Sequence, residues 1–238
     1  MLNAIKFGQG KAKAIILSPI QAEALNIEGI ENTLNFLAQD YQMEYIDSLQ
    51  WINQAKTIEA YISLFKQKIY HLLNEANLII GFSFGGTLLQ YILPELDNIS
   101  AKLILISSPS LIDKSLHKKL SHIRELLLLG HSKEAVNYLN GFIFNQDNNP
   151  EEKELNQLGI NRLLEGFRLI LEADAKNHIK LSKKKYLHLC GDSSTLVNIN
   201  HIITNKNALI ASVPHAKMRV LQDNPNYSQK IIKNYLGI

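Results

Sequence analysis

Short apolar runs alternate with longer amphipathic stretches along the first half of the chain. The runs have the length and composition of strands that are buried on both faces of a sheet. The stretches between them carry apolar residues at helical spacing, most clearly from Ile58 to Leu73. This alternation predicts a mostly parallel α/β sheet with right-handed crossovers. The expected strands are Lys13–Leu17, Glu44–Asp47, Leu78–Ile80 and Lys102–Ile106, and a first helix is expected from Ile30 to Leu37.

The pattern changes after the fourth expected strand. From 111 to 181 no strand is evident, and we expect three helices at His117–Leu129, Ser132–Phe144 and Glu151–Leu171. The apolar run Leu126–Leu129 should pack onto the sheet or line an apolar pocket. A strand, Tyr186–Gly191, and a last helix, Ser228–Leu236, follow. We therefore expect a sheet core formed by 1–110 and 182–238, with 111–181 as a helical insertion.

A glycine-flanked serine lies between the third expected strand and the helix that follows it. The segment is Gly81-Phe82-Ser83-Phe84-Gly85. At the tip of a tight strand-to-helix turn, Ser83 would take a strained backbone conformation that exposes its hydroxyl, and side chains at the two glycine positions would collide. The N–H of Phe84 would start the helix and point to where a substrate oxyanion forms. The sequence thus predicts a nucleophilic serine.

This segment resembles the nucleophile elbow of the α/β-hydrolase fold, in particular that of small bacterial esterases such as the pimeloyl-carrier-protein methyl esterases. The resemblance implies a serine-dependent carboxylesterase or thioesterase. It also implies that 111–181 is a helical lid, whose composition suits an apolar acyl chain, free or on a carrier protein. The family usually has His-Gly after its first parallel strand, and here Ser18-Pro19-Ile20 stands there. Pro19 has no N–H, so Ile20 or Gln21 would supply the second oxyanion donor.

The family places its catalytic acid shortly after the glycine that ends the next-to-last strand, in a G-x-x-D frame. Here the frame begins at Gly191, so the acid position falls on Ser194 and Asp192 comes two residues early. Asp192 would still lie at the carboxyl end of a strand, where it could face the site. The expected acid is therefore Asp192, and Ser194 departs from the family pattern.

The histidine of the triad can be placed in three ways. If Lys217–Leu221 is the last strand and Ala208–Val213 ends a helix, the histidine position falls on Asn226, whose amide cannot act as a general base. If Ala208–Val213 is the last strand, His215 follows it and completes Ser83–Asp192–His215. The third possibility is a histidine from elsewhere: His201, His117, His122 or His131.

Composition narrows the classes of partner and the cellular location that the protein can have. The 25 basic and 22 acidic residues give a net charge of +3, which is too balanced for a nucleic-acid binder. Cys190 is the single cysteine, so an internal disulfide is excluded, and no apolar run approaches membrane-spanning length. We expect a cytoplasmic protein with no cofactor, no metal, no membrane span and no nucleic-acid partner.

Two functions from different classes remain open. The first is a serine hydrolase of an apolar acyl ester or thioester. The second is a catalytically degenerate relative of the α/β-hydrolases that binds a small apolar ligand or a partner protein. The second is motivated by Ser194 and Asn226, which occupy the acid and histidine positions in the first of the three alignments.

Overall fold

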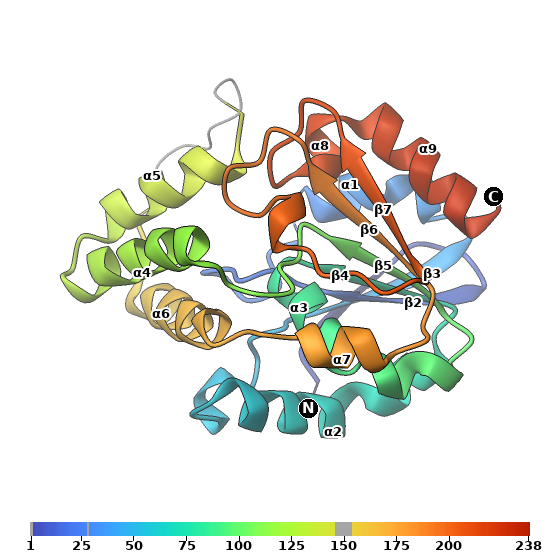
Figure 1. Cartoon of the computed structure of the whole chain (residues 1–238), viewed down its shortest axis with the longest axis horizontal. Coiled ribbons are helices and arrows are strands. Elements are labelled where there is room, and N and C mark those ends of the chain that lie inside the picture. Colours follow the sequence, from blue (N-terminus) through green and yellow to red (C-terminus); the bar gives the residue numbers. More distant parts are fainter. Residues whose placement is uncertain (1, 28, 146–153) are drawn as a thin grey trace.

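The computed structural model describes residues 2–27, 29–145 and 154–238, and its centre is a seven-stranded sheet (Figure 1). The strand order is β1-β3-β2-β4-β5-β6-β7. β1 pairs antiparallel with β3, and every other neighbouring pair is parallel. The expected mostly parallel α/β sheet is confirmed. The strands are β1 (Ala4–Phe7), β2 (Ala12–Leu17), β3 (Tyr41–Ile46), β4 (Leu78–Phe82), β5 (Lys102–Ile106), β6 (Tyr186–Gly191) and β7 (Ala208–Val213).

The central strands are apolar on both sides because helices cover both faces of the sheet. In β5, Leu103 and Leu105 belong to one hydrophobic cluster, while Ile104 and Ile106 belong to the other. This alternation explains why the strands appear in the sequence as unbroken apolar runs. Figure 1 shows α2, α3 and α7 on one face and α1, α8 and α9 on the other. Their bounds are α1 (Ile30–Leu34), α2 (Ile58–Glu75), α3 (Phe84–Tyr91), α7 (Lys176–Leu181), α8 (Val220–Asp223) and α9 (Pro225–Leu236).

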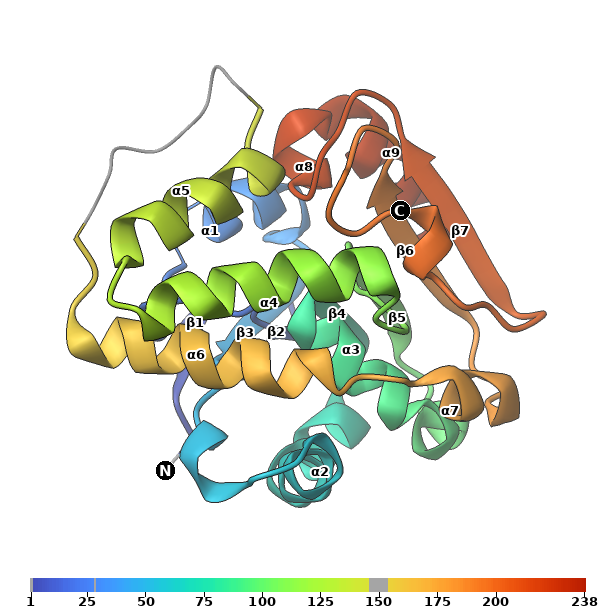
Figure 2. The ribbon, with the colours of Figure 1, turned by 60° about the vertical axis from the view of Figure 1, so that its left-hand side comes forward.

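Three longer helices lie between β5 and β6, and Figure 2 shows them side by side. They are α4 (Lys114–Leu128), α5 (Ser132–Ile143) and α6 (Gln157–Leu171). The side chain of Asp113 caps α4, and that of Asn156 caps α6 by accepting a hydrogen bond from the N–H of Gly159. Residues 151–153, where the third helix was expected to begin, lie outside the described residues. Helix α7, which follows α6, was not expected.

The leucine run at the end of α4 divides between interior and solvent. Leu127 is 3% exposed, but Leu128 and Leu129 are 60% and 66% exposed. The expectation that the whole run is covered was therefore wrong, because a helix turns consecutive residues to different faces. Among the described residues, no helix combines the length and the apolar character that crossing a membrane requires.

The end of the sheet differs from the first of the three alignments. Ala208–Val213 is strand β7, and it pairs with β6 from Tyr186 opposite Ala208 to Gly191 opposite Val213. The segment Lys217–Leu221 is not a strand, since its last residues already belong to α8. The prediction of a helix end at 208–213 and a last strand at 217–221 was wrong. The second alignment, with β7 followed by His215, has the correct strand.

His188 is fully buried in the middle of β6. Its Nε2 accepts a hydrogen bond from the N–H of Ser108 at 3.4 Å, and its Nδ1 has no partner among the described residues. Burial lowers the pKa of His188 from 6.5 to about 3. The imidazole is therefore a neutral core group.

This lowered pKa makes the stability depend on pH. Between the two pKa values the unfolded chain binds a proton at His188 that the folded chain does not, so the free energy of unfolding should fall as pH decreases below the unfolded value. The expected contribution is about 1.4 kcal/mol per pH unit. Urea unfolding between about pH 7 and 5 would measure it, with His188→Leu as the control that lacks this slope. Equal slopes for both proteins would contradict the prediction.

Candidate active site

Ser83 lies directly between β4 and α3 in a backbone conformation that non-glycine residues rarely adopt. Its φ is 46° and its ψ is −111°. A Cβ at Gly81 would lie 2.5 Å from Cα of Gly86, and a Cβ at Gly85 would lie 2.7 Å from the carbonyl oxygen of Ser18. The neighbouring glycines are thus required by close backbone approach. This is the strained turn that the G-x-S-x-G pattern predicts.

Hydrogen bonds to the main chain of Ser83 hold the serine turn, and none of them uses the Ser83 hydroxyl. The N–H of Ser83 donates to the carbonyl oxygen of Ile106 at 2.8 Å, and Thr87 Oγ1 lies 3.3 Å from the carbonyl oxygen of Ser83. The residue is half-buried, and Ser83 Oγ makes no hydrogen bond with any described residue. A nucleophile needs an oxygen that is accessible and not already committed, and Ser83 meets both conditions.

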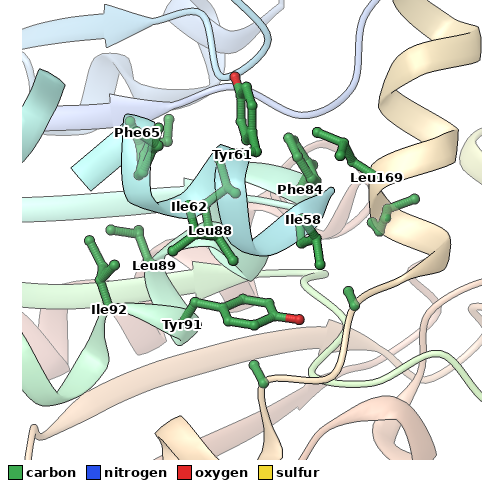
Figure 3. Packing of buried hydrophobic residues seen from close by; sticks show 14 of the residues in the cluster. Ile58, Tyr61, Ile62, Phe65, Phe84, Leu88, Leu89, Tyr91, Ile92 and Leu169 are labelled. Atoms are coloured by element: carbon green, nitrogen blue, oxygen red, sulfur yellow. The ribbon is translucent and has the colours of Figure 1, made fainter. Parts of the chain in front are cut away.

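Phe84 begins α3 and anchors it to the core. Its side chain is fully buried, and its ring centroid lies 6.1 Å from that of Tyr61 (Figure 3). The N–H of Phe84 belongs to the first turn, whose N–H groups have no acceptor within the helix. The positive end of the helix dipole is therefore directly beside Ser83. Such a group is suited to stabilise a negative oxygen.

The loop after β2 packs against this turn. The N–H of Gly85 donates to the carbonyl oxygen of Ser18 at 3.2 Å. The hydroxyl of Ser18 in turn accepts a hydrogen bond from the N–H of Ser48 at 2.9 Å. Ser18 is fully buried, and its two hydrogen bonds connect the loop after β2 with the serine turn and with the segment after β3. Pro19 and Ile20 follow Ser18 in the chain, and an oxyanion donor from Ile20 stays a prediction.

Asp192 follows β6 and holds the main chain of His215. Its Oδ1 accepts hydrogen bonds from the N–H of His215 and from the hydroxyl of Ser193, both at 2.8 Å. The structure thus brings Asp192 and His215 together through a backbone contact. The carboxylate fixes the loop that carries the imidazole. It makes no hydrogen bond to the imidazole itself.

The loop after β7 turns back across the carboxyl edge of the sheet. The N–H of Ser193 donates to the carbonyl oxygen of Ala216 at 3.0 Å, and the hydroxyl of Ser107 donates to that of Met218 at 2.8 Å. Ser107 follows β5, the strand next to the one that carries Ser83. His215 is exposed at the start of this loop, with a φ of 59°, and its ring makes no hydrogen bond to a described residue. The fold therefore places His215 at the carboxyl edge of the sheet, where Ser83 also lies, with the strands β5 and β6 between β4 and β7.

The two positions that depart from the family pattern have different outcomes. Asn226 is exposed within α9, after the intervening helix α8, so it does not occupy a position directly after the last strand. The assignment of the histidine position to Asn226 was wrong, because the strand on which it rested does not exist. Ser194 is 4% exposed, and its hydroxyl has no hydrogen-bond partner among the described residues.

The other candidate histidines are engaged elsewhere. His201 Nδ1 accepts the N–H of Asn198 at 3.1 Å, and its Nε2 lies 3.3 Å from Asp113 Oδ1. With both nitrogens occupied, His201 is not available to activate a serine. His117 contacts Ser121, while His122 and His131 are exposed and lie near glutamates one helical turn away. Within the described ranges, no three His, Cys, Asp or Glu side chains are grouped to bind a metal ion.

Ser107 was missed by the sequence reasoning. It has a φ of 49°, and the other described non-glycine residues with positive φ are Leu25, Ser83 and His215. Three of these four residues follow strands at the same edge of the sheet. Backbone strain concentrates where function requires a fixed geometry. A lone serine after a strand gives no such signal in a sequence, so only the structure identifies it.

No protein-family model and no curated protein matches the chain, whereas several solved structures match it. An alpha/beta hydrolase enzyme, MGS-M2, from a Medee basin deep-sea metagenome library has a TM-score of 0.81 at 13% identity, covering 99% of this chain and 94% of its own. The esterase EaEST from Exiguobacterium antarcticum has a TM-score of 0.76 at 12% identity, with coverages of 99% and 95%.

MenH from S. aureus has a TM-score of 0.71 at 14% identity and covers 100% of this chain and 98% of its own. The similarity thus spans essentially the whole length of each protein, including the inserted helices. Identities this low carry information about the fold alone. Together with the strained serine turn and the mostly parallel sheet, these matches show that the chain has the α/β-hydrolase fold.

Proposed function

We propose that the protein is a serine hydrolase that cleaves an ester or thioester of an apolar acyl group, free or on a carrier protein. The observation that carries the proposal is Ser83, a strained, half-buried serine at the start of a helix, whose hydroxyl makes no hydrogen bond within the part of the chain that the structure describes. His215 is its general base. The names of the structural neighbours support this chemistry, since they include an esterase and several hydrolases.

In the proposed reaction His215 takes the proton of Ser83 as Ser83 Oγ bonds to the acyl carbon. The N–H groups of Phe84 and Ile20 stabilise the oxyanion. The bond to the leaving group then breaks, and His215 returns its proton to the leaving oxygen or sulfur. A water molecule, activated by the same imidazole, releases the acid from the acyl-enzyme.

The role of Asp192 in this proposal is to position His215 through its main chain. A carboxylate that does not bond to the imidazole fixes neither its tautomer nor its orientation, and losing that function lowers serine-protease turnover by about 10⁴-fold. We therefore expect a slow enzyme. The helical insertion 111–181 serves as the lid over the acyl chain in this proposal, with apolar residues of α4 and α6 turned inward.

A fluorophosphonate probe tests the proposal, because it phosphonylates only activated serines. Mass spectrometry should find the label on Ser83 between about pH 6 and 9. Ser83→Ala should remove both the label and any hydrolysis of p-nitrophenyl butyrate. Ser63→Ala is the matched control, since it removes an exposed hydroxyl from α2 and leaves Ser83 and the His215 loop in place. A folded wild-type protein without label would exclude the serine hydrolase.

A second candidate is a degenerate hydrolase fold that binds an apolar ligand or a partner protein. It is favoured by two observations. Asp192 bonds to the main chain of His215, and Ser194, at the family's acid position, is buried with a hydroxyl that has no partner among the residues described by the structure. It predicts neither labelling nor turnover. The probe experiment therefore decides between the two candidates.

A further inference from the structure

Helix α6 lies directly along the loop that follows β2. An added Cβ at Gly159 would lie 3.3 Å from Cβ of Ala22, and one at Gly166 would lie 2.9 Å from Cγ2 of Ile20. Arg162, between these glycines on the same face, donates from Nε to the carbonyl oxygen of the intervening residue, Gln21, at 3.2 Å. The inserted helix and the candidate oxyanion loop are therefore in close contact over three consecutive residues.

Arg162 is also locked onto the end of β3. Its Nη2 lies 2.8 Å from Asp47 Oδ1, and its Nη1 lies 3.0 Å from Asp47 Oδ2. The two side chains are only 10% and 2% exposed. Two parallel hydrogen bonds fix the plane of the guanidinium. Because that plane is fixed, the direction of the third bond, from Nε to Gln21, is fixed as well.

Gln21 is held at three atoms in total. Its Nε2 donates to the carbonyl oxygen of Asn26 at 3.0 Å, and its Oε1 accepts the hydroxyl of Tyr45 at 2.9 Å. Burial raises the pKa of Tyr45, so this hydroxyl keeps its proton and remains a donor. With the carbonyl oxygen held by Arg162, the peptide groups around Gln21 cannot rotate freely.

A buried ion pair of this kind is poorly explained by stability alone. The cost of removing both charges from water is of the same size as their attraction, and apolar replacements are often as stable. The geometry offers another explanation, since Arg162 joins an inserted helix to the loop after β2, and the first residue of that loop, Ser18, accepts the N–H of Gly85 in the serine turn. We propose that Arg162, held by Asp47, is a positioning residue that fixes the Ile20 or Gln21 N–H as an oxyanion donor.

This proposal rests on the proposed hydrolase function, and it makes α6 part of the catalytic scaffold. A donor displaced by a fraction of an ångström loses much of its effect, and losing one donor costs about 10²–10³-fold in kcat. We expect Arg162→Lys to lower kcat for p-nitrophenyl butyrate by about 10- to 100-fold with little change in KM. Lysine keeps a cation for Asp47 but cannot make the bidentate pair and the bond to Gln21 together.

A second variant removes the charges altogether. Asp47→Asn with Arg162→Met should fold with a thermal midpoint near that of the wild type, yet show the same loss of kcat and of the fluorophosphonate labelling rate. Asn is chosen because Asp47 Oδ1 also accepts the N–H of Leu49, at 3.0 Å. Its amide oxygen preserves that contact.

The matched control is Arg168→Lys on the same helix. Arg168 pairs with Glu165 at 2.8 Å and donates to the carbonyl oxygen of Ala55 at 3.2 Å. Its replacement should leave kcat within about twofold, because its partners do not include the loop after β2. If both arginines had only a structural role, Arg162→Lys and Arg168→Lys would lose similar amounts of stability and would have similar kcat values.

The outcomes separate this proposal from the function on which it rests. If the wild type is labelled and the Arg162 variants react as fast as the wild type, the positioning role is excluded. If the wild type is not labelled, the hydrolase proposal fails. Amide hydrogen exchange of Ser18, Ile20, Gln21 and Ala22 then still decides whether Arg162 fixes the loop. Faster exchange in Arg162→Lys, but not in Arg168→Lys, supports it, and equal exchange rules it out.

Discussion

Replacing His215 with glutamine is expected to slow the phosphonylation of Ser83 by about 10³-fold or more. Glutamine has a similar size but no basic nitrogen near neutral pH, so the serine hydroxyl loses its proton acceptor. The measurement is the second-order rate constant for a fluorophosphonate probe, followed by mass spectrometry of the intact protein. Circular dichroism would establish that the variant is folded, since an exposed side chain contributes little to stability.

Two controls make this result specific. Asn226→Ala changes the residue that one alignment placed in the histidine position, and it should leave the rate unchanged because Asn226 is exposed in α9. His201→Gln changes a buried histidine whose two nitrogens are already engaged. A His215 variant that reacts as fast as the wild type, or an Asn226 variant that loses the reaction, would refute the assignment of the general base.

Gly191→Ala is expected to destabilise the protein by about 1–3 kcal/mol and to disrupt the His215 loop. Gly191 ends β6 where the loop after β7 crosses directly over it. A Cβ there would lie 2.1 Å from the carbonyl oxygens of both Ala216 and Lys217. These are backbone atoms, so they cannot rotate away as a side chain would. The loop itself must shift, and His215 must shift with it.

Urea unfolding and the labelling rate together measure this effect. The labelling rate of the folded Gly191 variant should fall more than tenfold, in line with the sensitivity of catalysis to small displacements. Gly141→Ala is the control, because a Cβ at Gly141, inside α5, meets no atom within 4 Å. That variant should be more stable by about 0.4–1 kcal/mol, with an unchanged rate. Full labelling by Gly191→Ala would contradict the crossing-loop geometry.

The serine turn could be predicted from the sequence because its requirements are local. A strand, a serine between two glycines and a helix follow each other within a few residues, and steric collisions leave no other residue at Gly81 and Gly85. The buried strands could be predicted for a similar reason. Each is apolar on both faces, so its identity does not depend on which neighbour it meets.

The last strand could not be predicted in this way. β7 is an edge strand with a mixed burial pattern, and only Val213 at its end is buried. Its apolar residues are as compatible with a helix as with a strand. Pairing with β6 along six residues decides the matter, and that partner is a separate segment of the chain. The position of His215 depended entirely on this pairing.

The sequence by itself determined the sheet class, the place of the inserted helices and the choice of Ser83 as the candidate nucleophile, because each follows from local periodicity or local sterics. Only the tertiary structure decided which histidine follows the last strand, how Asp192 contacts it and that Arg162 joins α6 to the loop after β2. These relations connect residues far apart in the chain. They exist only once pairing and packing have fixed the geometry between them.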